Sequence, residues 1–441
     1  MCFSGCIRRV GHRGYLQLIC CQFSTRDDQY RSARGAETGV STEIQSSFSN
    51  MTAESLIKEN DFAILKTGKA ARLVQLNKGA VYVEKRKFNC QDIIGHPWGQ
   101  VFAITCGKKG EATLSVVPRQ DYVDHIFNAS EKVGSSTSGQ DNRDILDENR
   151  SQKLTREEIT KLKQDGASSV DIVRSLVENS DTFSDKTNYS QQKYLQKKLK
   201  KYDSFFQACR PTVRLLSELY WSQNPLKVGM LRPDSLASVL ASANILGKGK
   251  YIVMDSFLGL LTAGVLQHCA EGQVIQVLDY MGYQSSTRQA VQAIGLDSTR
   301  LLSVDYHLVE KLASGLKLRE DCPEDPMNDR RVTKFQKNME ALSLLQQRDF
   351  AGLIMNCRGD IVEPCVLLLK FLRLSGTFVV FSPHLGVITN LYDTLKSKGG
   401  CVMLKVSESW IRGYQVLENR THPVINMQGA SGFILTGIKC E

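Results

Sequence analysis

The sequence lacks the features of several protein classes. No apolar run reaches the roughly 18 residues that cross a bilayer, so no membrane span is predicted. The 13 cysteines are scattered, without a CxxC pair and without a group of His and Cys at zinc-binding spacing. We therefore expect no metal site and no disulfide framework. Reduced thiols in a cytosolic or nuclear protein are the simplest interpretation.

Length and charge leave other classes open. The 441 residues are 42% apolar, which is enough to bury a sizeable core and predicts two or three domains. Lys and Arg outnumber Asp and Glu by 56 to 46, a formal net charge of +10. An excess of this size suits a polyanionic partner, but it is also common in proteins that bind none.

The first 50 residues differ in composition from the rest. Up to Arg26 the chain has four arginines, no acid and a short apolar patch at residues 16–21, which loosely resembles a mitochondrial presequence. Met51 stands directly before the first patterned segment. We expect residues 1–50 to form a disordered leader, or to lie upstream of the start that the cell uses.

Three segments are expected between residues 51 and 225. Short alternating apolar runs, such as "FAILKTG" and "AVYVEKR", predict an N-terminal β-barrel domain over residues 51–125. The Ser- and Gly-rich interval at 126–150 predicts a flexible loop. Residues 151–225 are expected to form a helical basic connector, whose first helix opens with Thr155 three residues before Glu158, the spacing of a capping box.

The segment "KTNYSQQKYLQKKLKKY", residues 186–202, holds six lysines and no acid. On a helix, residues 193, 197, 200 and 201 share one side, where they can follow RNA phosphates, and three interleaved tyrosines are available for stacking. A solvated helix face is the simpler interpretation. The candidate RNA contacts here are Lys193, Lys197, Lys198, Lys200 and Lys201.

From residue 226 to residue 441, strands and helices are predicted to alternate, which makes this an α/β domain. Seven strand candidates, the last two close enough in sequence to form an antiparallel pair, outline a Rossmann-like class I methyltransferase fold. Ligands bind such sheets beyond the carboxyl ends of the strands, beside the first strand. The candidates are residues 251–255, 272–278, 301–309, 350–356, 376–381, 401–407 and 432–438.

The turn after the first of these strands, in "YIVMDSFLGLLTAG", departs from the pattern of enzymes that use S-adenosylmethionine. That pattern is acid-x-Gly-x-Gly-x-Gly, because glycines without a Cβ let the backbone approach the cofactor. Aligned on Asp255, it places Phe257 and Leu261 at two glycine positions and keeps only Gly259. Both side chains are expected to project into or beside the methyl-donor volume, which predicts a degenerate cofactor site. Asp255 and Asp279 keep open the alternative of an active turn of unusual sequence.

The end of the fourth strand, in "LIMNCRGD", is also atypical. Methyltransferases that act on bases usually place there an acid, or an Asn followed by Pro, to hold the target nitrogen and manage its proton. Asn356 is followed instead by Cys357 and Arg358, and an amide is a poor proton acceptor. No catalytic residue is therefore predicted.

Several long stretches carry a family resemblance, among them "IIGHPWGQVFAI", "LRPDSLASVLASANI" and "ESWIRGYQVLENRTHPVINMQGASGFILTG". Through them, most of residues 51–441 resembles the non-catalytic subunit of the tRNA (adenine-58-N1)-methyltransferase. The resemblance implies a tRNA-binding subunit that is not itself an enzyme and that holds no cofactor. It also implies a catalytic subunit as partner, which binds the S-adenosylmethionine. Together they would form a two-plus-two heterotetramer in the nucleus that makes N1-methyladenosine at position 58 of the T-loop.

Further candidate tRNA contacts lie in these stretches, namely Arg232, Arg412 and Arg420. The alternative for them is structural, since Arg232 can cap a helix and Arg412 can pair within the fold. His422 is expected to be a packed turn residue, and the strands around Trp410 are expected to form a subunit interface. Two other functions stay open: an active S-adenosylmethionine-dependent RNA methyltransferase, and an RNA-binding translation scaffold without a modification partner.

Overall fold

The computed structural model describes most of the chain after residue 55. The described residues belong to one compact unit, Ser55–Glu441, whereas the unit Met1–Glu54 lies outside them. The predicted disordered leader, most of the predicted loop at 126–150 and Arg420 therefore also lie outside the described residues. The described ranges are 56–68, 70–77, 79–83, 86–106, 112–118, 122, 138–139, 151–165, 167, 169–202, 205–279, 285–316, 329–416, 421–427 and 429–441.

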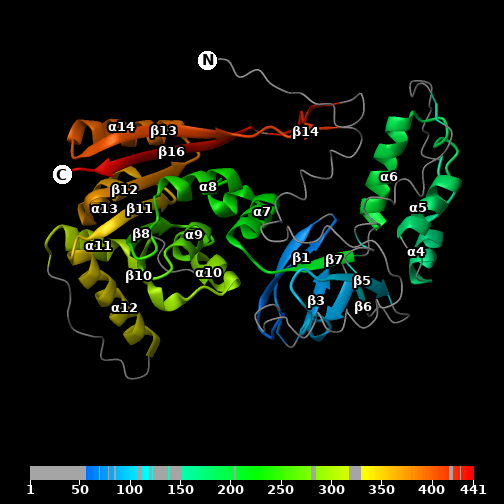
Figure 1. Ribbon diagram of the computed structural model, residues 1–441, viewed down its shortest axis with the longest axis horizontal. Helices are drawn as coiled ribbons and strands as arrows, with labels where there is room; N and C mark the ends of the chain where they lie inside the picture. The colour runs from blue at the N-terminus through cyan, green and yellow to red at the C-terminus, as the bar shows by residue number, and fades with distance from the viewer. Residues whose placement is uncertain are drawn as a thin grey trace, which may run out of the picture. The chain divides into compact units, whose positions relative to one another are not determined.

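The N-terminal part is a five-stranded antiparallel sheet with the strand order β2-β1-β7-β5-β6 (Figure 1). In its core, the ring of Phe206 stacks between those of Phe88 and Phe102, with the centroids 5.3 Å apart in both pairs. A separate antiparallel N-terminal domain is confirmed, whereas its closure into the predicted barrel over residues 51–125 stays a prediction. Its strands are β1 (Phe62–Thr67), β2 (Ala71–Gln75), β5 (Val101–Cys106), β6 (Ala112–Val117) and β7 (Phe205–Cys209), with a separate hairpin of β3 (Ala80–Val83) and β4 (Arg86–Asn89).

Strand β7 comes from the segment expected to be a helical connector. It pairs with β1 on one side and with β5 on the other, so it is the central strand of the N-terminal sheet. The following helix, α7 (Val213–Gln223), contributes Leu216 and Leu219 to the core of the C-terminal sheet. The connector therefore ends before β7 rather than at residue 225. A strand finds its partners through tertiary packing, which the short pattern "FFQAC" does not reveal.

Three helices lie between β6 and β7 in the chain: α4 (Arg156–Gln164), α5 (Ser169–Glu178) and α6 (Asn188–Tyr202). The predicted capping box at α4 is confirmed. The backbone N–H of Glu158 donates to Thr155 Oγ1 over 3.3 Å, and the backbone N–H of Thr155 donates to Glu158 Oε2 over 2.8 Å. The helices share a buried cluster that includes Ile172, Leu176 and Leu195, so they form a small unit of their own.

The C-terminal part is a seven-stranded sheet with the order β10-β9-β8-β11-β12-β16-β13 (Figure 1). The first five strands are parallel, and β16 runs antiparallel between β12 and β13. The predicted Rossmann-like arrangement and its antiparallel final pair are confirmed. The strands are β8 (Lys250–Asp255), β9 (Gln273–Leu278), β10 (Leu301–Asp305), β11 (Phe350–Asn356), β12 (Leu372–Ser382), β13 (Cys401–Trp410) and β16 (Ala430–Lys439).

One strand candidate was too long, because α11 begins at Tyr306 where a strand to residue 309 was expected. Tyr306 and Val309 are both buried, at the three-residue spacing that places them on one helix face. The helices beside the sheet are α8 (Pro233–Ser242), α9 (Leu260–His268), α10 (Gln289–Ile294), α11 (Tyr306–Ala313), α12 (Asp329–Gln346), α13 (Val362–Leu368) and α14 (Leu385–Lys398).

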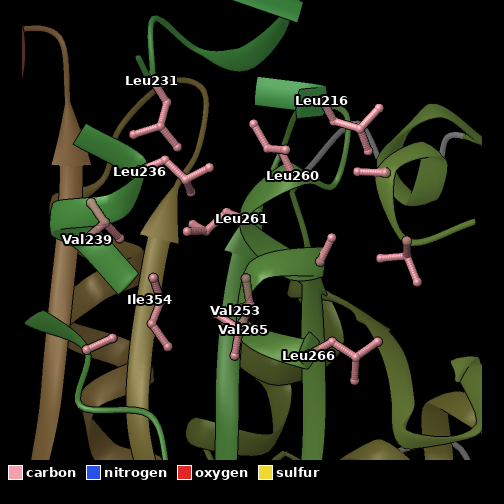
Figure 2. Close-up of a cluster of buried hydrophobic side chains, with 14 of the residues drawn as sticks. Leu216, Leu231, Leu236, Val239, Val253, Leu260, Leu261, Val265, Leu266 and Ile354 are labelled. Atoms are coloured by element: carbon pink, nitrogen blue, oxygen red, sulfur yellow. The ribbon is translucent and has the colours of Figure 1, made fainter. Parts of the chain in front are cut away.

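Both faces of this sheet are covered, because alternate residues of its strands enter two different hydrophobic cores. In β8, Tyr251 and Val253 face the core made with α7 to α10, whereas Ile252 and Met254 face the core made with α11 to α14. Figure 2 shows part of the first core. Burial on both faces explains why the parallel strands are almost continuously apolar in sequence.

We expect the substitution Phe206→Ala to lower the free energy of unfolding by about 3–5 kcal/mol, because it removes a fully buried ring from the centre of the N-terminal sheet. Phe205→Ala, which removes the half-buried ring of the preceding residue, is the matched control and should cost less. Denaturant unfolding, with hydrogen exchange of β1 and β5, measures the difference. If both substitutions lowered the free energy of unfolding equally, the burial of Phe206 at the centre of the sheet would be contradicted.

Candidate functional site

Asp255, the last residue of β8, organises the turn that leads into α9. Its Oδ1 accepts a hydrogen bond from the backbone N–H of Phe257 over 3.1 Å, and its Oδ2 accepts from those of Leu261 and Thr262 over 3.0 and 3.1 Å. Burial raises the pKa of this carboxyl group, and the hydrogen bonds partly oppose that rise. Asp255 therefore satisfies the first turn of α9, whose N–H groups have no partners within the helix and whose dipole favours a carboxylate.

Gly259, the one retained glycine of the turn, packs against another part of the same chain. Its φ of 72° is left-handed, and it directly precedes α9. A Cβ added at this position would overlap the carbonyl oxygen of Thr287, in the segment that follows β9. The backbone N–H of Ala290 also donates to the carbonyl of Leu258 over 3.0 Å. The close backbone approach that glycine permits is thus made to the protein itself.

Phe257 lines a cleft of about 660 Å³ beyond the carboxyl ends of β8, β11 and β12. Its ring lies against Gly229, where an added Cβ would overlap it. The guanidinium carbon of Arg358 lies over the ring, 5.1 Å from the centroid. This is the side of the sheet where a ligand was expected. That Phe257 obstructs a methyl donor there stays a prediction.

Leu261 was expected to project into or beside the methyl-donor volume, and it is not among the residues that line the cleft. The residue is 1% exposed and packs in the core beside the sheet. Figure 2 shows it among Leu236 of α8, Val253 of β8 and Ile354 of β11. The reason is its position on the face of α9 that packs on the sheet.

The strand end beside the cleft is poorly equipped for proton transfer. Among the described residues that line the cleft, none is a carboxylate. Asn356 is 3% exposed and donates through Nδ2 to the carbonyl of Val228 over 3.2 Å. Burial, aided by nearby carboxylates such as that of Asp279, raises the pKa of the Cys357 thiol to about 12. Cys357 therefore remains a thiol, which is a poor nucleophile, at neutral pH.

Arg232 is 7% exposed and paired within the fold, which favours the structural alternative over the predicted contact with tRNA. Its Nε lies 2.5 Å from Asp234 Oδ1, its Nη2 donates to Asp234 Oδ2 over 2.9 Å, and its Nη1 donates to the carbonyl of Gly429 over 2.9 Å. Asp234 Oδ2 also accepts from the hydroxyl of Ser409 over 2.7 Å. Arg232 precedes α8 without a side-chain capping bond. It joins the start of that helix to the C-terminal strands.

The lysines of α6 differ in exposure. Lys193, Lys197 and Lys201 are exposed, as a phosphate contact requires. Lys198 is half-buried, with Nζ 5.1 Å from the centroid of the Tyr194 ring, and burial together with the neighbouring lysines lowers its pKa. Lys200 lies in the helix, but its side chain is outside the described part of the chain. Lys193, Lys197 and Lys201 are thus more exposed than Lys198, although Nζ of Lys193 and of Lys201 also lie 6.0 and 5.4 Å from the ring centroids of Tyr189 and Tyr202. Their contact with phosphates stays a prediction.

The tyrosines of α6 make contacts within the protein, and the stacking of RNA bases on Tyr189 and Tyr194 stays a prediction. Tyr202 is buried at 5% exposure, and the ring of Tyr194 packs edge-on against Phe183 with the centroids 5.5 Å apart. The hydroxyl of Tyr189 donates to Gln415 Oε1 over 3.3 Å. Burial removes Tyr202 from contact with RNA, whereas Tyr189 and Tyr194 are half-buried.

The C-terminal candidates are less enclosed. Arg412 is half-buried after the end of β13, in the chain that leads to β14 (Tyr414–Gln415). His422 is exposed in β15 (His422–Pro423), so it is not the packed turn residue that was expected. Trp410, the last residue of β13, is 66% exposed. Within the described ranges, no three His, Cys, Asp or Glu side chains gather as a metal site would require, and no helix has the length and apolar character of a membrane span.

A sequence model of the Gcd10p family matches residues 56–343. The chain belongs to the Gcd10p family. It is 29% identical to the "tRNA (adenine(58)-N(1))-methyltransferase non-catalytic subunit TRM6" of Mus musculus, over 86% of this chain and 88% of that protein. It is 27% identical to the trm6 protein of the same description in Dictyostelium discoideum, over 88% of this chain and 80% of that protein. The solved structure of the tRNA (m1A58) methyltransferase TrmI from Aquifex aeolicus is 12% identical, with a TM-score of 0.44, and the match covers 88% of this chain and 99% of that one.

In this Gcd10p-family chain, sequence reasoning missed the polar network around Arg232. The hydroxyl groups of Ser235, Ser409 and Ser431 lie within 2.5 to 2.9 Å of one another, beside the ion pair of Arg232 and Asp234. One signal was present in "LRPDS", since Asp234 follows Pro233 in the first turn of a helix, where an acid is favoured. The partners on β13 and β16 are about 200 residues away, and no local pattern announces them.

We expect Arg232→Ala to lower the free energy of unfolding by about 3–5 kcal/mol, because it leaves Asp234 buried without its partner. The matched control is Arg214→Ala, which breaks the exposed pair with Glu218 and should cost less than about 1 kcal/mol. The side chains are 9% and 19% exposed in the first pair and 65% and 44% in the second. Urea unfolding measures both. If Arg232→Ala instead left the stability unchanged and weakened tRNA binding, Arg232 would be a tRNA contact after all.

Proposed function

We propose that this Gcd10p-family chain is the non-catalytic, tRNA-binding subunit of a tRNA (adenine-58-N1)-methyltransferase. The mouse and Dictyostelium relatives bear that name, and the alignment covers most of their length. The observation that carries the proposal is the turn after β8. Gly259 packs against Thr287 there, and the carboxylate of Asp255 is enclosed by the start of α9. Because this turn packs against its own chain, we infer that methyl transfer takes place in a partner subunit.

We infer that S-adenosylmethionine is bound by the catalytic partner and not by this chain. The cofactor carries a sulfonium, an ammonium and one carboxylate group, so its net charge is positive and a lining without carboxylates does not balance it. The described lining of the cleft includes Arg358 and no carboxylate. N1 methylation also needs a group that manages a proton, and Asn356 followed by Cys357 is a poor choice for that role.

The exposed lysines of α6 support the tRNA-binding part of the proposal. Lys193, Lys197 and Lys201 lie four residues apart, so they share one side of the helix. Contacts to phosphates hold an RNA in register without reading its sequence. Such contacts suit a subunit that positions tRNA for a partner's active site.

The edge of the seven-stranded sheet is the proposed contact with the catalytic partner. Strand β13 is an edge strand, and Val402, Met403 and Trp410 on it are 47%, 76% and 66% exposed. An exposed apolar edge favours pairing with another chain, and aromatic residues are enriched at interfaces. The two-plus-two stoichiometry and residence in the nucleus are part of the same proposal, and they rest on the family resemblance.

We expect N1-methyladenosine formation on tRNA only when this chain is produced together with a catalytic partner of the family. Each subunit alone and the pair are incubated with a tRNA transcript and S-adenosylmethionine, and the modified nucleoside is quantified by mass spectrometry. Full activity of the partner alone would contradict a role for this chain in methylation and would favour a translation scaffold.

Calorimetry with S-adenosylmethionine on this chain alone serves as the control for the cofactor argument. A micromolar dissociation constant, which corresponds to about 8 kcal/mol of binding, would identify an active methyltransferase instead. No heat of binding, together with micromolar binding by the pair, is the expected result.

We expect the double variant Lys193→Ala, Lys197→Ala to reduce the steepness of log affinity for tRNA against log salt by about 1.8, which is about 0.9 for each lost phosphate contact. The control is Lys396→Ala, Lys398→Ala in the last turn of α14, which removes the same charge from exposed positions of another helix. Fluorescence anisotropy at several salt concentrations measures the slopes. Identical slopes for the two double variants would leave α6 as an ordinary solvated helix.

A further inference from the structure

We propose that the cleft beyond β8, β11 and β12 is a binding pocket for one unpaired nucleotide of an RNA chain, whose base stacks beside Phe257 and Arg358. The inference rests on the proposed function, since it names a contact by which the subunit would hold its RNA. Of the tyrosines of α6, Tyr202 is buried and Tyr194 packs edge-on against Phe183, so the cleft offers a second aromatic surface in addition to that helix.

Three aromatic side chains from separate elements converge on this cleft. Trp221 comes from the end of α7, Phe257 from the turn after β8, and His384 from the residue directly before α14. The guanidinium of Arg358 lies over the Phe257 ring and adds a second planar group. Aromatic rings and guanidinium planes are the surfaces on which proteins stack unpaired bases.

Groups able to hydrogen-bond the edge of a base stand around the same space. The amide of Asn356 and the hydroxyl groups of Ser382 and Ser431 line the cleft. Each already makes a hydrogen bond within the protein, so a bound base shares these groups with Val228, His384 and Ser409. Amides and hydroxyls both donate and accept hydrogen bonds, as the mixed edges of nucleobases require. The volume of about 660 Å³ lies within the range of pockets for ligands of nucleotide size.

The charge of the lining favours an anionic or neutral ligand. Arg358 is exposed at the cleft, and the described lining residues include no Asp or Glu. A guanidinium beside an aromatic ring suits a nucleotide, because it stacks on the base or pairs with the phosphate.

The rim of the cleft is open, because Leu226 is 68% exposed and Arg358 and Gly359 are also exposed. An open rim lets the phosphates on either side of a bound nucleotide leave the pocket, as a nucleotide within a chain must. A free mononucleotide offers the same base and phosphate. The experiment therefore separates these two sources.

The test uses the co-purified pair with a tRNA transcript that carries 4-thiouridine, and in a parallel transcript 6-thioguanosine, in its unpaired loops. After irradiation, we expect mass spectrometry to find nucleotide adducts on the peptides of this chain that contain Phe257 or Trp221. Arg358→Ala should lower these adducts about tenfold through the loss of one stacking layer. Arg358→Lys should lower them similarly, because it keeps the charge but not the plane.

Arg373→Ala is the matched control, since Arg373 is an exposed arginine near the start of β12 and is not among the cleft residues. It should leave the adducts unchanged. Phe257→Ala should also remove the adducts. If that variant does not fold, the test rests on Arg358→Ala, because the side chain of Arg358 is exposed.

Adducts absent from the cleft peptides, or equal in Arg358→Ala and Arg373→Ala, would overturn the inference. Protection of the cleft by adenosine or uridine monophosphate at a concentration below that of the tRNA would also overturn it, in favour of a free nucleotide. If the pair still needs this chain for methylation while the cleft shows no adduct, only the inference fails. If the pair neither binds nor methylates tRNA, the proposed function fails first.

Discussion

The buried carboxylate of Asp255 is the interaction on which the rest of the C-terminal domain depends. It accepts hydrogen bonds from the backbone N–H groups of Phe257, Leu261 and Thr262, and so it fixes the junction between β8 and α9. That junction sends Phe257 into the cleft and Leu261 into the core, and it brings Gly259 against Thr287. A carboxylate in this position is stabilised by the start of a helix, so it needs no ligand to be satisfied.

A second fixed point holds the C-terminal strands in place. Arg232 and Asp234 lie at the start of α8, and their hydrogen bonds reach Ser409 on β13 and the main chain at the start of β16. Arginine, which binds RNA phosphates in other settings, serves here as an internal brace, because Arg232 is buried and paired with Asp234. The lysines of α6 differ from Arg232 in exposure, since Lys193, Lys197 and Lys201 face solvent.

The elements that the sequence predicted well are those whose burial is uniform along the element. Strands β8, β9 and β11 are enclosed on both faces, so their apolar runs are continuous and their limits are plain. The capping box of α4 is likewise complete within four residues, Thr155 to Glu158. Strand β7 and the polar network of Arg232 were not predictable in this way, because each depends on partners far away in the chain.

By itself, the sequence determined that the chain ends in an α/β domain, that the turn after Asp255 has lost two of its three expected glycines, and that α6 is a basic helix. These features are local, and residue type and spacing are enough to specify them. Only the tertiary structure decided that Phe257 faces the cleft while Leu261 faces the core, and that Arg232 is enclosed while Arg358 is open. The physical reason is that the direction and burial of a side chain are set by what packs against it, and those neighbours come from distant parts of the chain.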